Sequence, residues 1–90
     1  MKTSQAEDIA LKLFQGMACD DELMQRFLDM TGLSYDSLRQ ASQSSGFMLA
    51  VIDFISGNEH DLLALAERLK IKPEDIMHAR HTLSPHGEFF

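Results

Sequence analysis

The segment between Gly46 and Gly57 constrains the fold of this chain more than any other feature. Apart from Asp53, every residue from position 47 to position 55 is apolar. Its β-branched residues are compatible with a strand, but no neighbouring segment offers a partner strand. We therefore predict a helix over residues 46–56, and a helix that is apolar on all sides belongs at the centre of a fold.

The rest of the chain shows helical spacing, with apolar residues recurring every three or four positions. The first segment begins near Thr3 or Ser4, where Ser4 and Glu7 have the pattern of a capping box. The residues that we expect to start the later helices are Asp20, Ser34, Asn58 and Pro73. We predict an all-α compact bundle of five or six short helices, one domain over residues 1–90 with residues 84–90 as a C-terminal tail.

Charge and composition narrow the classes of partner. Eight Lys and Arg against fourteen Asp and Glu give a formal net charge of −6, which disfavours nucleic acid and anionic membranes. No apolar run reaches the roughly 20 residues of a membrane span, and no signal-peptide stretch follows Lys2. The single cysteine, Cys19, cannot form an internal disulfide, which fits a reducing compartment. We expect a cytoplasmic protein.

The segment from Leu65 to Ile76 has the apolar spacing of a DNA-binding helix-turn-helix. Lys70, however, stands at the turn position that usually holds glycine. The helix that would enter the DNA groove begins with Glu74 and Asp75, whose carboxylates would meet phosphates. We therefore expect a turn that packs two helices, and keep a nucleic-acid-binding regulator as an alternative.

Two histidines and a glutamate are the candidate metal ligands. Glu74, His78 and His81 are spaced by four and three residues, so all three share one helix face. A metal site in a helical bundle also needs carboxylates from facing helices. Solvated histidines near a helix C-terminus are the simpler interpretation, and we expect no metal and no other cofactor.

Asp53 is the most informative single polar residue. A carboxylate within an apolar helix is costly unless it is paired or protonated. We expect it to serve as a polar anchor bonded to Arg26, Arg39, Thr31 or a helix N-terminus, and a role in a polar pocket is the alternative.

Two runs of sequence carry a resemblance to a known family. They are RFLDMTGL at residues 26–33, continued by Leu38 and Arg39, and GFMLAVIDF at residues 46–54, followed by Leu62 and Leu63. Both resemble a small family of alphaproteobacterial proteins known only as a domain of unknown function. The resemblance implies a compact all-helical fold and a bacterial cytoplasmic setting. It carries no activity, so it transfers no catalytic residue.

No catalytic constellation is present in the sequence, so we do not expect an enzyme. A non-enzymatic interaction or adaptor domain is the preferred function, with a metal- or small-molecule-binding protein as a further alternative. Exposed apolar surface often marks contact sites, and the candidates here are Met77, Phe89 and Phe90. We expect a protein partner. This partner can be a second copy of the chain, bound through the C-terminal region in a weak homodimer.

Overall fold

The computed structural model describes residues 1–84, which form α-helices joined by short turns. In chain order the helices are α1 (Thr3–Ala18), α2 (Asp21–Thr31), α3 (Tyr35–Ala41), α4 (Ser45–Ser56), α5 (Glu59–Leu69) and α6 (Pro73–Leu83). No strand occurs within this part of the chain. The predicted all-α class is therefore confirmed. Phe89 and Phe90 lie outside the described residues.

Short-range hydrogen bonds fix where the helices begin. The predicted caps Asp20, Ser34 and Asn58 each accept a hydrogen bond from the backbone N–H three residues further on, at 3.1, 3.3 and 3.2 Å. Gly32 ends α2 in the left-handed conformation, with φ of 76°. These helix ends follow from local chemistry, because the capping side chain satisfies a backbone donor that the helix leaves free.

The capping box predicted from Ser4 and Glu7 is wrong. α1 begins at Thr3, so Ser4 already lies inside the first turn. A bond of this kind is made two positions earlier instead: the backbone N–H of Lys2 donates to Oε1 of Gln5 at 3.0 Å.

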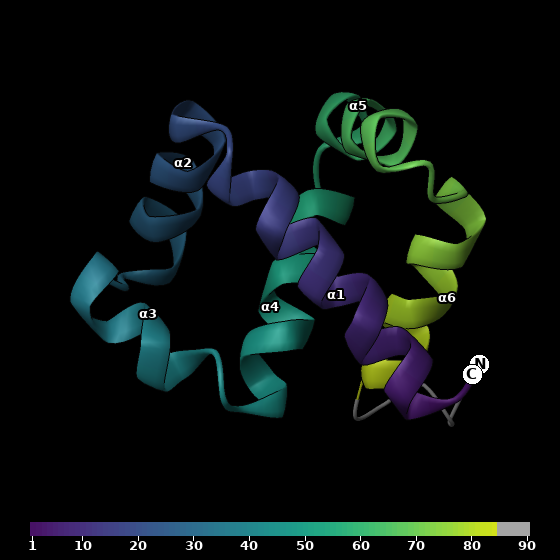
Figure 1. Ribbon diagram of the computed structural model, residues 1–90, viewed down its shortest axis with the longest axis horizontal. Helices are drawn as coiled ribbons and strands as arrows, with labels where there is room; N and C mark the ends of the chain where they lie inside the picture. The colour runs from purple at the N-terminus through teal and green to yellow at the C-terminus, as the bar shows by residue number, and fades with distance from the viewer. Residues whose placement is uncertain (85–90) are drawn as a thin grey trace.

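α1 lies across the middle of the molecule, with α2 and α3 on one side of it and α5 and α6 on the other (Figure 1). It contacts α2, α4, α5 and α6. Its buried stripe is spaced by three and four residues and consists of Ala6, Ala10, Leu13, Gly16 and Met17. Small residues in this stripe let neighbouring backbones approach closely, so α1 packs against four helices at once.

α4 contributes to the core without being enclosed by it. Phe47, Val51, Ile52 and Ile55 are buried, whereas Gly46 and Asp53 are exposed. The predicted position of this helix at the centre of the fold is therefore not confirmed, because one of its faces is exposed. A carboxylate keeps its hydration when it stays at the surface, and Asp53 turns one face of α4 toward solvent.

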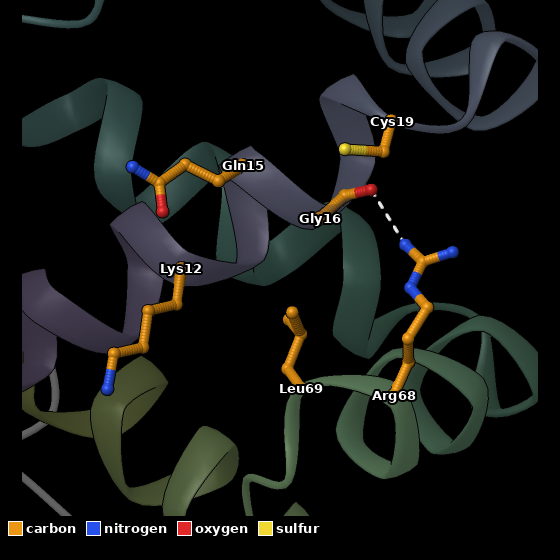
Figure 2. A pocket seen from close by; sticks show the side chains of 6 residues that line it. All are labelled: Lys12, Gln15, Gly16, Cys19, Arg68 and Leu69. Carbon is orange, nitrogen blue, oxygen red and sulfur yellow. Dashed lines mark hydrogen bonds between the residues drawn. The ribbon is translucent and has the colours of Figure 1, made fainter.

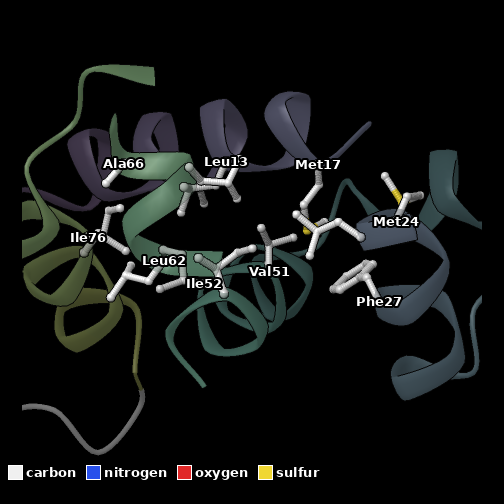
Figure 3. Packing of buried hydrophobic residues seen from close by; sticks show 14 of the residues in the cluster. Leu13, Met17, Met24, Phe27, Val51, Ile52, Leu62, Ala66 and Ile76 are labelled. Carbon is white, nitrogen blue, oxygen red and sulfur yellow. The ribbon is translucent and has the colours of Figure 1, made fainter. Parts of the chain in front are cut away.

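Side chains from α1, α2, α4, α5 and α6 meet in one apolar cluster (Figure 3). Aromatic rings join α4 to α2 and to α1. Phe27 of α2 meets Phe47 and Phe54 edge to face at centroid distances of 5.8 and 5.5 Å. Phe14 meets Phe47 in the same way at 5.2 Å. Edge-to-face rings add to the stabilisation that burial supplies. α3 has no buried residue and lies at the periphery.

The turn between α5 and α6 holds a residue in an unusual conformation. Lys70 adopts the left-handed region, with φ of 58° and ψ of 43°. The backbone N–H of Ile71 then donates to the carbonyl oxygen of Ala66 at 2.9 Å and closes the end of α5. The Cβ of a lysine crowds its own backbone in this conformation. The strained turn therefore lowers the free energy of unfolding.

Replacing Phe47 with alanine should lower the free energy of unfolding by about 3–5 kcal/mol, because the substitution removes a buried ring that two other rings contact. Phe54→Ala should cost roughly half as much, since Phe54 is only partly buried. Urea denaturation followed by circular dichroism measures both. Unchanged stability in Phe47→Ala would mean that the core lies elsewhere.

Lys70→Gly should raise the free energy of unfolding by up to about 1 kcal/mol, because glycine adopts the left-handed conformation without strain. Lys72→Gly is the matched control. Lys72 has an ordinary φ of −69°, so glycine there relieves nothing and should lower stability slightly. The midpoints of thermal and urea unfolding should rise in Lys70→Gly and fall in Lys72→Gly. Equal shifts in the two variants would contradict this explanation.

Candidate functional site

An open groove lies between the C-terminal half of α1 and the end of α5, with a volume of about 360 Å³ (Figure 2). We call it the α1–α5 groove. Its lining residues are Lys12, Gln15, Gly16, Cys19, Arg68 and Leu69. Both charged side chains among them are cations, although the chain as a whole carries a net charge of −6.

Gly16 brings the two helices together at the floor of the groove. A Cβ at this position would lie 3.1 Å from Cδ2 of Leu65 and 3.1 Å from Cδ1 of Leu69. Only a residue without a side chain leaves both leucines where they are. The absence of a Cβ at Gly16 therefore sets how closely α5 approaches α1.

Arg68 ties α5 to the end of α1. Its Nη2 donates a hydrogen bond of 2.7 Å to the carbonyl oxygen of Gly16 (Figure 2). The same carbonyl oxygen accepts a longer bond of 3.3 Å from the backbone N–H of Cys19, and the carbonyl groups at the end of a helix carry partial negative charge. A guanidinium is therefore a favourable donor at this place, and its remaining N–H groups stay available at the edge of the groove.

The other side of Arg68 faces acidic residues that are engaged elsewhere. A small hollow there is lined by Asp20 and Asp61. Asp20 caps α2, and Asp61 forms an ion pair with Arg26 at 2.9 Å. Within residues 1–84, no carboxylate lies within ion-pair distance of the Arg68 guanidinium.

The groove offers binding surface rather than catalytic groups. Leu69 supplies an apolar, partly buried floor, and Cys19 is exposed at the rim. Within the described part of the chain, no histidine and no carboxylate lines the groove, so these residues assemble no His–carboxylate acid–base pair there. The arrangement can hold an apolar group between two cations.

The predicted partners of Asp53 are wrong. Its Oδ1 accepts a hydrogen bond of 2.5 Å from Nε of Arg80, and both side chains are about half exposed. Asp53 lies on the side of α4 that faces α6, whereas Thr31 bonds its own helix through the carbonyl oxygen of Phe27 at 2.9 Å. The pairing of Asp53 and Arg80 is thus a surface contact between α4 and α6.

The two arginines predicted as anchors have separate places. Arg26 pairs with Asp61 and lies over the ring of Phe54, at 5.9 Å from its centroid. Arg39 is exposed on α3 and forms no ion pair within the part of the chain that is described.

The candidate metal ligands are not brought together. Glu74, His78 and His81 are all exposed on α6. No group of three or more His, Cys, Asp and Glu side chains in residues 1–84 is placed to hold a metal ion. His78 instead lines a shallow hollow between α1 and α6 with Asp8 and Asp75. Met77 is 41% exposed on the same helix.

The sequence does not predict the α1–α5 groove. In the sequence, Gly16 indicates only a weaker last turn of the first helix, and nothing in the pattern places Arg68 against that helix. The available signal was the run of small residues Ala6, Ala10 and Gly16 on one stripe, which is typical of close helix approach. Which helix approaches cannot be deduced from that pattern.

The fold and groove define a small all-helical domain. The family described as "Protein of unknown function (DUF3572)" matches residues 3–86, which include all of α1 to α6. The chain belongs to this family, and the expected membership of an unknown-function family is confirmed. No curated protein and no solved structure matches the chain. Among residues 1–84, no helix is long and apolar enough to cross a membrane.

Arg68→Ala should lower the free energy of unfolding by about 1 kcal/mol. The variant removes the charged donor of a partly buried hydrogen bond to the Gly16 carbonyl oxygen. Arg39→Ala is the control, since Arg39 makes no ion pair within residues 1–84, and its effect should stay within about 0.5 kcal/mol. Urea denaturation measures both. Equal effects would show that the Arg68 contact does not stabilise the α1–α5 junction.

Proposed function

We propose that this chain is a non-enzymatic interaction module that holds an apolar segment of a protein partner in the α1–α5 groove. One observation supports this function above the others: the groove is open, has an apolar floor at Gly16 and Leu69, and lies between two helices. Helices that bound a groove of this kind recognise peptide segments through apolar anchors.

The setting that we propose is the cytoplasm of a bacterium, as the resemblance to alphaproteobacterial proteins implies. The single Cys19 is exposed at the rim of the groove, and a reducing compartment keeps such a thiol unpaired. The function as an adaptor needs no cofactor and no reaction. A nucleic-acid partner is less favoured, because the first turn of α6 carries Glu74 and Asp75.

The test begins with a library of short random peptides displayed on phage and selected on the immobilised full-length protein. Enriched peptides should share an apolar anchor. Their affinity should fall at least about tenfold for Leu69→Glu, because this variant places a charge on the apolar floor.

Leu63→Glu is the matched control, since Leu63 lies on the same helix, is 48% exposed and does not line the groove. It should bind the selected peptides as the unaltered protein does, and circular dichroism should show that both variants are folded. No specific enrichment, or binding that Leu69→Glu leaves unchanged, would overturn the proposed function.

A further inference from the structure

The charges around the α1–α5 groove are unusual for this chain. Among residues 1–84, Lys12 and Arg68 are the only charged residues that line it, in a chain with fourteen Asp and Glu against eight Lys and Arg. Charged groups at an interface attract complementary partners and repel like-charged ones. A partner with negative charge at this place would therefore be favoured over a neutral or basic one.

The size of the groove limits how many groups it can hold. Three lining residues of α1 and Cys19, which directly follows the helix, run along one side of it from position 12 to position 19. At 1.5 Å of rise per residue this side is about 10 Å long. That length accommodates one apolar side chain and one or two neighbouring charged groups of a bound peptide.

The hollow between α1 and α6 differs from the groove because it carries both signs of charge. Lys12 lines it together with Asp8 and Asp75. A bound carboxylate would meet like charges in that hollow, whereas the charged residues that line the α1–α5 groove in the described part of the chain are both cations.

Arg68 is suited to the contact with a carboxylate. One of its N–H groups is held by the carbonyl oxygen of Gly16, which fixes the guanidinium at the edge of the groove. The remaining donors are free of carboxylates within residues 1–84. A guanidinium fixed in place loses little conformational entropy when it binds an anion.

Building on the function proposed above, we propose that the groove recognises an acidic apolar peptide segment, in which an apolar side chain lies over Leu69 and adjacent carboxylates bind Lys12 and Arg68. The interaction weakens as salt concentration rises, because exposed charges are screened. A long acidic segment is disfavoured, since the rest of the surface is negative.

The probes are three synthetic peptides of identical length, labelled with a fluorophore for anisotropy. The first carries leucines flanked on one side by glutamates, the second replaces each glutamate with glutamine, and the third replaces each with lysine. At low salt the Glu peptide should bind at least about tenfold more tightly than the Gln peptide, and the Lys peptide should bind most weakly.

Charge-reversed variants assign this preference to the groove. Lys12→Glu and Arg68→Glu should each reduce the preference for the Glu peptide over the Gln peptide, whereas Arg39→Glu should leave it unchanged. Lys12 makes no hydrogen bond or ion pair with another side chain within residues 1–84, so Lys12→Glu remains informative if Arg68→Glu impairs folding.

The outcomes separate this inference from the proposed function. If the three peptides bind equally and Leu69→Glu abolishes their binding, the groove is an interaction site but the preference for acid is wrong. If phage selection gives groove binders without acidic residues and the Glu peptide does not bind, the inference is also wrong. If neither the synthetic nor the selected peptides bind, the proposed function itself is overturned.

Discussion

The burial of one stripe of α1 against four other helices is the interaction on which the rest of the structure depends. Ala6, Ala10 and Leu13 are fully buried, and the first two are small enough to let α4 and α6 come close. Apolar area removed from water stabilises a fold in rough proportion to its extent, and α1 packs against α2, α4, α5 and α6. α2 joins this assembly through Phe27, whose ring is enclosed by rings from α4. α3 contributes only partly buried side chains.

The groove follows from the same arrangement. α5 reaches α1 at Gly16, where no side chain separates the helices, and the longer side chains at positions 12, 15 and 19 surround the contact instead. Arg68 satisfies the end of α1 and at the same time places a cation beside the groove. Gly16 and Arg68 therefore both stabilise the contact between α1 and α5 and shape the groove beside it, to which Arg68 adds a positive charge. This coupling explains why a mostly acidic domain presents a cationic, apolar groove.

Much of the fold could be predicted from the sequence, because helix ends depend on residues a few positions apart. Asp20, Ser34 and Asn58 cap helices as their chemistry indicates, and Gly32 ends α2 in the conformation that glycine favours. Contacts between distant residues could not be deduced in this way. The pairing of Asp53 with Arg80 depends on how α4 and α6 cross, and Arg68 meets Gly16 across 52 positions of sequence. The strongly apolar sequence of α4 predicts that this helix lies at the centre of the fold. The helix that packs along its length against four others is α1.

Hydrogen–deuterium exchange measured residue by residue by NMR tests most directly whether α1 organises the fold. Amides that open only when the whole domain unfolds exchange with the global free energy of unfolding, whereas peripheral segments open locally. The backbone N–H groups of α1 between Ala10 and Met17 should be among the most protected in the chain, and those of α3 the least. Rapid exchange of these α1 amides, alongside slow exchange confined to α4, would contradict the central role given to α1.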